Sequence, residues 1–200
     1  MKFHKYLEQF LGSKASVSIL RAFFEYRGRV FTVRRLAETA KISHTEANQT
    51  VSKLESLGII KVQPVGKAYL LSLNEKSYIL NNIVEPLFVA ENKTLLTLVN
   101  ILKKHLTTKK IISAVVFGSV ARGEEREDSD IDLLVVSDNF DHAAGVVADA
   151  REEVALVFHS SLSPIIFDRK KFVAKKRDDL VQSILKSHII ITGMDLEKIR

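Results

Sequence analysis

The chain has 200 residues, of which 46% are hydrophobic and 27% charged, and this ordinary globular composition excludes a disordered or fibrous protein. It has no cysteine, which excludes a disulfide framework, a thiolate nucleophile and a zinc ribbon. The first residues do not resemble a signal peptide and no run of about 20 apolar residues is present, so we expect a cytoplasmic protein.

The positive charge is concentrated in the first part of the chain. Residues 1–75 contain 12 basic and 6 acidic side chains, whereas residues 76–200 contain 18 of each. This asymmetry predicts two modules, the first of which faces a polyanion such as nucleic acid. A surface that is charged only for solubility is the alternative explanation.

The basic part is predicted to contain three helices followed by a hairpin. Apolar residues recur at helical spacing before Gly28, Thr32 can cap a short second helix, and Ser43 with Glu46 forms a capping box for a third helix over residues 43–57. Two extended runs, residues 59–63 and 68–73, flank a Pro-Val-Gly-Lys turn.

This arrangement resembles the winged helix-turn-helix domains of prokaryotic transcription regulators, over residues 12–75. The resemblance implies that the third helix enters the major groove of double-stranded DNA, while nearby cations contact phosphates. Short polar side chains on that helix suit base edges, since Asn and Gln can pair with adenine. The candidate DNA-binding residues are Arg34, Arg35, His44, Thr45, Asn48, Gln49, Lys61 and Lys67. A protein–protein or dimerisation module is the alternative.

Residues 76–94 are predicted to form a helical connector. Pro86 is expected to end one helical segment and to stand in the first turn of the next. Helical spacing continues after the connector through Leu95, Leu98, Val99, Leu102 and Leu106. We interpret this apolar stripe as core or as the interface of a homodimer.

The strongest motif of the chain begins with a short apolar strand, Ala114 to Phe117. The strand ends at Gly118, which permits a tight turn and a close approach of the backbone to a ligand. Ser119 then begins a helical turn whose free N–H groups and hydroxyl can bind a phosphate. Arg122, one turn later, can add charge-assisted hydrogen bonds to the same phosphate.

Two carboxylates lie at the head of the next predicted strand, Leu133 to Val136. Because strand side chains alternate, Asp130 and Asp132 share one face while Ile131 points to the core. Two carboxylates opposite a phosphate-binding turn suit Mg²⁺ or Mn²⁺ that bridges phosphate oxygens. Without a cation their mutual repulsion would raise a pKa.

Gly118-Ser119, Arg122-Gly123 and Asp130-Ile-Asp132 together resemble the minimal nucleotidyltransferases of the DNA-polymerase-β-like superfamily, over residues 95–193. The resemblance implies transfer of a nucleoside monophosphate from a nucleoside triphosphate to a hydroxyl acceptor. The triphosphate would bind Gly118, Ser119 and Arg122, and the metal would bind Asp130 and Asp132. The expected fold class is α+β, with a winged helix domain at 1–75, the connector at 76–94 and a nucleotidyltransferase domain at 95–200 whose mixed sheet is flanked by helices.

The chain departs from the family in one respect. These enzymes generally carry a third carboxylate on a later strand, where it helps to activate the acceptor hydroxyl. The strand expected here, residues 162–167, has no acidic residue, and Ser161 or Ser163 stands in that place. Asp168 directly follows the strand and is the candidate third catalytic carboxylate, although it also suits the cap of a helix that begins near Arg169.

Three roles remain open from the sequence. The chain can be an enzyme, tethered to DNA, that modifies a protein, an RNA end or a small molecule. It can instead be a winged-helix regulator whose second domain senses nucleotide, or an antitoxin-like partner of a small helical protein, a role that minimal nucleotidyltransferases often have. The intact phosphate and metal motifs favour the enzyme, whereas the missing third carboxylate favours the regulator.

Overall fold

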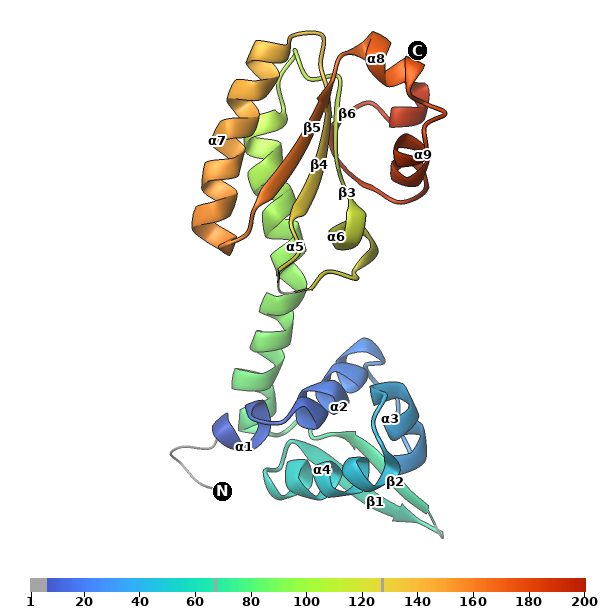
Figure 1. The fold of residues 1–200 in the computed structure, drawn as a ribbon. Coiled ribbons are helices and arrows are strands. Elements are labelled where there is room, and N and C mark those ends of the chain that lie inside the picture. The colour runs from blue at the N-terminus through green and yellow to red at the C-terminus, as the bar shows by residue number, and fades with distance from the viewer. Residues whose placement is uncertain (1–6, 67, 127) are drawn as a thin grey trace. The chain divides into compact units, whose positions relative to one another are not determined.

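The computed structural model describes residues 7–66, 68–126 and 128–200 (Figure 1). The chain divides into two compact units, Met1–Lys93 and Thr94–Arg200. Among the described residues no helix is long and apolar enough to cross a membrane.

The first unit is built from helices and one hairpin. In chain order it contains α1 (Leu7–Leu11), α2 (Lys14–Glu25), α3 (Val33–Ala40), α4 (His44–Ser56), β1 (Ile60–Val65), β2 (Ala68–Leu73), the π-helix η1 (Leu80–Val84) and the start of α5 (Glu85–Leu106). The predicted caps of α3 and α4 are confirmed, because the Thr32 and Ser43 side chains accept hydrogen bonds from the N–H groups of Arg35 and Glu46.

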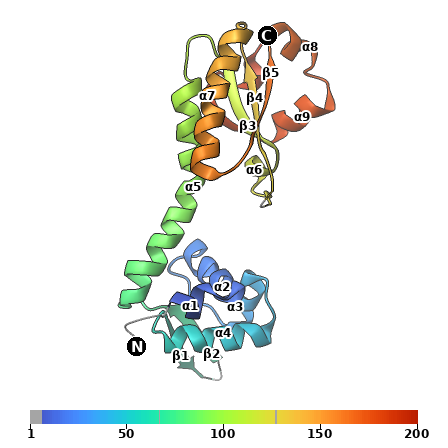
Figure 2. The same ribbon diagram turned by 60° about the vertical axis from the view of Figure 1, so that its left-hand side comes forward.

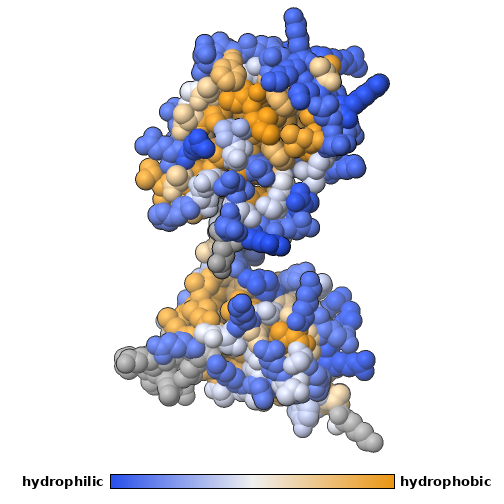
Figure 3. Space-filling view, in the orientation of Figure 1, coloured by the Kyte–Doolittle hydropathy of each residue, from blue (hydrophilic) through white to orange (hydrophobic). Residues whose placement is uncertain are grey.

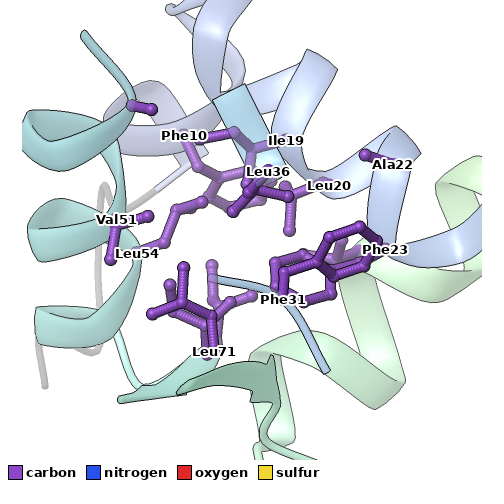
Figure 4. Close-up of a cluster of buried hydrophobic side chains, with 14 of the residues drawn as sticks. Phe10, Ile19, Leu20, Ala22, Phe23, Phe31, Leu36, Val51, Leu54 and Leu71 are labelled. Atoms are coloured by element: carbon purple, nitrogen blue, oxygen red, sulfur yellow. The ribbon is translucent and has the colours of Figure 1, made fainter. Parts of the chain in front are cut away.

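An aromatic and aliphatic core holds these elements together (Figure 4). The rings of Phe23 and Phe31 meet edge to face, with centroids 5.2 Å apart. Phe31 also exchanges two backbone hydrogen bonds with Leu71 of β2, which ties the loop before α3 to the hairpin. The apolar side of α4, with Val51 and Leu54, packs into this core and leaves the opposite, polar side of the helix exposed.

The structure differs from the sequence prediction in the place of Pro64 and in the effect of Pro86, which stands in the first turn of α5 as predicted. Pro64 lies inside β1, opposite Tyr69, and not in the turn. β1 is the outer strand of the hairpin, since Phe31 bridges to β2, and an edge strand tolerates the missing N–H. Pro86 is the second residue of α5, and the preceding π-helix, closed by the bond from the Glu85 N–H to the Leu80 carbonyl, widens the helix without ending it.

The second unit contains a mixed four-stranded sheet in the order β5-β4-β3-β6. After the C-terminal half of α5 come β3 (Ser113–Phe117), α6 (Gly118–Arg122), β4 (Ile131–Val136), α7 (Phe140–Phe158), β5 (Leu162–Phe167), α8 (Arg169–Ala174), α9 (Asp179–Lys186), β6 (Ile189–Gly193) and the 3₁₀-helix η2 (Leu196–Lys198). β3 runs antiparallel to β4 and β6, and β4 runs parallel to β5.

Helices cover both faces of this sheet, as expected for the α+β class. α5 and α7 lie on one side and α8 and α9 on the other (Figures 1 and 2). The alternation along β4 serves both layers: Leu133 packs under α5 and α7, whereas Leu134 joins the core beneath α8 and α9. In Figure 3 hydrophobic side chains gather on the visible side of this unit, over β4 and β5.

Two further details of this part of the chain bear on the sequence prediction. The sequence pattern over residues 170–186 predicts one helix, but this stretch is divided into α8 and α9; Asp178 is the N-cap residue of α9, and its carboxylate pairs with Lys175 at 3.1 Å without a side-chain hydrogen bond to the helix. Of the apolar stripe predicted as core or dimer interface, Leu102 and Leu106 are fully buried in the core, whereas Leu95 is 42% exposed.

Candidate active site

The strand pairing brings the two halves of the motif together at one end of the sheet. Phe117, the last residue of β3, pairs with Asp132 on β4, and Asp132 pairs on its other side with Ser163 on β5. Gly118 follows directly after Phe117. The turn at Gly118 therefore lies next to the Asp132 side chain.

Gly118 is constrained by its backbone and by its neighbour. Its φ of +73° lies in the left-handed region that favours glycine. A Cβ atom at this position would also lie 2.0 Å from Oδ2 of Asp132, well inside van der Waals contact. The carboxylate thus occupies the space that any other residue at 118 would need for its side chain.

The carboxylates differ in their surroundings. Asp130 is exposed and precedes β4, whereas Asp132 is half-buried within it. Burial raises the pKa of the Asp132 carboxyl above its ordinary value, the charge of Asp130 raises it further, and the Arg122 guanidinium opposes the rise. The charge of Asp130 thus acts on Asp132 in the direction that the sequence predicts.

This pair fits a hard divalent cation. Both candidate ligands supply carboxylate oxygens, and a cation would stabilise their charges against the burial and the mutual repulsion that raise the pKa of Asp132. Within the described parts of the chain, no three or more His, Asp or Glu residues are placed to hold a metal ion together. Mg²⁺ is commonly held by one or two carboxylates together with substrate phosphates and water, so two protein ligands suffice.

The candidate phosphate ligands lie on α6. Ser119 is half-buried in the first turn of this helix, and Arg122 is its last residue. Nε of Arg122 donates a hydrogen bond of 2.7 Å to Oε2 of Glu124. Sequence reasoning missed this partner, although Glu124 stands only two residues after Arg122, beyond a glycine that reverses the chain.

Asp168 is not brought to this end of the sheet. β5 runs parallel to β4, so Ser163 lies beside Asp132 while Asp168 follows the opposite end of the strand, about 16 Å further along. Its carboxylate accepts a 2.7 Å hydrogen bond from the Lys171 N–H and caps α8. This placement does not fit the third catalytic carboxylate that we expected Asp168 to supply.

Ser163 holds the position where that carboxylate was expected. It is in register with Asp132, and its neighbours on the same face of β5 join the core beneath α8 and α9, as do those of Asp132 on β4. Adjacent strands lie about 4.8 Å apart, so an acid at 163 would lie beside Asp132. Ser161, the alternative from the sequence, precedes the strand and is exposed.

In the first unit, the candidate DNA-binding residues of α4 share one exposed side. His44, Thr45, Asn48 and Gln49 are all exposed on this helix. Nδ2 of Asn48 lies 3.1 Å from the His44 carbonyl and from Nδ1 of the His44 ring. This side of α4 is thus polar, accessible and partly ordered by its own contacts.

The candidate phosphate-binding cations are more dispersed. Arg34 and Arg35 on α3 are exposed, and both pair with Glu38, at 3.2 and 3.3 Å. Lys61 stands near the start of β1 and lines a pocket of about 710 Å³ with Arg27 and Arg29, away from the tip of the hairpin. Lys67 lies outside the described residues.

The comparisons with known proteins bear on the second unit. Residues 97–195 match the family model described as a nucleotidyltransferase domain. Over 89 residues the chain is 33% identical to a provisionally named protein adenylyltransferase of Methanocaldococcus jannaschii, a match that covers 42% of this chain. It spans 60% of the length of that curated relative.

Solved structures give weaker likenesses. A toxin–antitoxin crystal structure with AMP-PNP has 20% identity and a TM-score of 0.34, over 50% of this chain and 76% of that chain. TrmBL2, described as an archaeal chromatin protein, has 16% identity and a TM-score of 0.30, over 90% of this chain and 72% of that chain. These TM-scores are too low to bear on fold or function.

The family match covers the sheet, α6 and both carboxylates, and so it includes every element of the candidate site. Residues 97–195 form a nucleotidyltransferase domain.

Proposed function

We propose that the protein transfers a nucleoside monophosphate from a nucleoside triphosphate to a hydroxyl group, with a divalent metal. The observation that carries this proposal is that the Asp132 carboxylate fills the space beside Gly118, so that the turn proposed to bind phosphate and the carboxylate pair belong to one site. The name of the curated relative makes ATP the first nucleotide to test and a protein hydroxyl the first acceptor.

In this proposal each residue has a separate task. Asp130 and Asp132 would hold Mg²⁺ or Mn²⁺, which supplies charge neutralisation for the triphosphate and a lower pKa for the attacking hydroxyl. Ser119 and the N–H groups of the α6 turn would hold phosphate oxygens, and the positively charged guanidinium of Arg122 would add charge-assisted hydrogen bonds to them. The Gly118 backbone lets these groups approach the carboxylates closely.

The reaction is a substitution at the α-phosphorus. The acceptor oxygen forms a bond to that phosphorus, the bond to the β-phosphate oxygen breaks, and pyrophosphate leaves. The acceptor hydroxyl loses its proton in the process. Because Ser163 stands beside Asp132 in place of an acid, we propose that this proton passes to solvent and that turnover is slow compared with an enzyme that has a general base, whose assistance is worth ~10²–10⁴ in rate.

The test uses the full chain, Mg²⁺ and each of the four α-labelled ribonucleoside triphosphates, with proteins encoded by neighbouring genes as acceptors. Transfer of label that requires Mg²⁺ and is lost in Asp132→Asn supports the proposal. Mg²⁺-dependent triphosphate binding without transfer to any acceptor would favour a nucleotide sensor instead. Stable capture of a small helical partner without transfer would favour the antitoxin-like role.

We also propose that residues 1–75 form a winged helix domain that binds double-stranded DNA. The exposed polar side of α4, its buried opposite side and the surplus of six positive charges in this segment support the proposal. His44, Thr45, Asn48 and Gln49 would face the bases, and Arg34, Arg35 and Lys67 the phosphates. Lys61 is the weakest member of the set, since it lies at the base of the hairpin.

Salt-dependent duplex binding by the full chain tests this second proposal. Asn48→Ala should weaken the binding free energy for the preferred DNA sequence by ~1–3 kcal/mol, whereas Lys67→Ala should weaken binding to all sequences alike. Lys61→Ala serves as the charge-matched control and should have the smaller effect. Absence of duplex binding at low salt would make the unit a protein-interaction or dimerisation module.

A further inference from the structure

The ion pair between Arg122 and Glu124 lies at the edge of the candidate site. The pair is 2.7 Å long, and its side chains are 44% and 64% exposed. Arg122 is also close enough to Asp132 for its charge to act on that carboxyl. The guanidinium is therefore paired with an acidic residue outside the metal pair, while its charge also acts on Asp132 within it.

The backbone fixes where Glu124 stands. Gly123, with φ of +66°, reverses the chain after α6 in a left-handed conformation. The Glu124 N–H then donates a 3.0 Å hydrogen bond to the Ser119 carbonyl, and the Gly123 N–H donates one of 3.3 Å to Val120. These bonds hold the Glu124 side chain beside the same turn that would receive phosphates.

A negative charge in this position opposes an anionic ligand in two ways. It occupies Nε of Arg122, one of the donors that a phosphate oxygen could otherwise accept from, and it repels the phosphate directly. Since Glu124 is mostly exposed, it can rotate into solvent when a stronger partner for Arg122 arrives. Breaking this exposed pair is inexpensive, because surface ion pairs contribute little to stability.

We propose that Glu124 is a gate for the candidate nucleotide site: its carboxylate holds Arg122 in the free protein and competes with the triphosphate for it. This inference rests on the proposed function. Glu124 lowers triphosphate affinity and is released from Arg122 on binding. It is a regulator of affinity and takes no part in the chemical step.

Charge-matched variants of the full chain test the gate by calorimetric titration with ATP and Mg²⁺. Glu124→Gln should bind ATP about two- to fivefold more tightly than wild type, the range expected for an exposed ion pair. Glu125→Gln makes the same charge change at the next residue, which is exposed and has no hydrogen bond or ion pair within the described structure. Glu125→Gln should therefore increase the affinity for ATP less than Glu124→Gln does. In an Arg122→Gln background the advantage of Glu124→Gln over Glu125→Gln should vanish.

The outcomes separate this inference from the function on which it rests. If the wild type binds ATP and the two variants Glu124→Gln and Glu125→Gln change the affinity equally, the gate is overturned and the proposed function stands. Weaker binding by Glu124→Gln also overturns the gate, since Glu124 would then position Arg122 for the nucleotide. No ATP binding by any variant overturns both. The gate is supported if Glu124→Gln binds ATP more tightly than wild type and this increase requires Arg122.

Discussion

Gly118→Ala should damage the candidate site far more than it damages the fold. The variant places a side chain at φ +73°, which costs roughly 1–2 kcal/mol in the left-handed region. Its methyl group would also start 2.0 Å from Oδ2 and 3.0 Å from Cγ of Asp132, so the carboxylate must move. Disturbing the orientation of a metal ligand typically costs 10–100-fold in metal affinity, and we expect a loss of that order in Mg²⁺-dependent ATP binding.

Gly123→Ala is the matched control, because Gly123 has φ +66° and a methyl group there would meet no atom within 4 Å. It should lose the same roughly 1–2 kcal/mol of unfolding free energy in urea titration, with ATP affinity close to wild type. If Gly118→Ala binds ATP with Mg²⁺ as well as Gly123→Ala does, Asp132 is not the metal ligand that we infer.

Three further predictions concern titration and catalysis. Asp132→Asn should raise the melting temperature in EDTA at neutral pH, because burial and then the charge of Asp130 raise the pKa of Asp132. This gain in melting temperature should grow as the pH rises from the ordinary Asp pKa through the raised one, and it should vanish where Asp132 is protonated in both the folded and the unfolded state. A gain that does not depend on pH would contradict this explanation. Glu153→Gln should destabilise the protein at neutral pH, since hydrogen bonds from Lys104 (2.8 Å) and His105 (2.5 Å) lower the pKa of Glu153. The difference should be constant above the ordinary Glu pKa and disappear as the pH falls through the lowered one, as thermal unfolding across pH would show; persistence in acid would contradict the ion-pair explanation. Ser163→Asp should raise turnover by up to ~10² without tightening ATP binding, whereas Ser163→Asn, the uncharged control, should turn over at about the slow wild-type rate; equal rates in both variants would refute a missing general base.

Much of the fold could be predicted where local chemistry and burial agree. The residues predicted for β5 coincide with the observed strand, and α4 begins directly after its predicted cap, Ser43. In both cases the apolar period and the flanking residues indicate the same boundary. The nucleotidyltransferase domain was expected from the glycine turn and the paired carboxylates, and the family match bears this out.

The sequence was less informative where long-range pairing decides the outcome. The parallel register of β4 and β5 places Ser163 beside Asp132 and Asp168 at the far end, and residue order alone does not determine that register. The π-helix before Pro86 is another such case, because the rule that proline ends a helix allows for no local widening. The pairing of Glu124 with Arg122 depends on a left-handed glycine between them.

In the proposed reaction, nucleotide binding and proton removal depend on different residues. Gly118, Asp132 and the turn that follows form one geometric unit, in which the carboxylate fills the space that the glycine leaves open. Ser163 lies on a different strand, so an uncharged residue there leaves this unit unchanged. An enzyme and a nucleotide sensor are therefore expected to bind ATP and Mg²⁺ in the same way. They differ only in the transfer step, in which a base removes the proton of the acceptor hydroxyl. Turnover with an acceptor, compared between wild type and Ser163→Asp, is the measurement that distinguishes them.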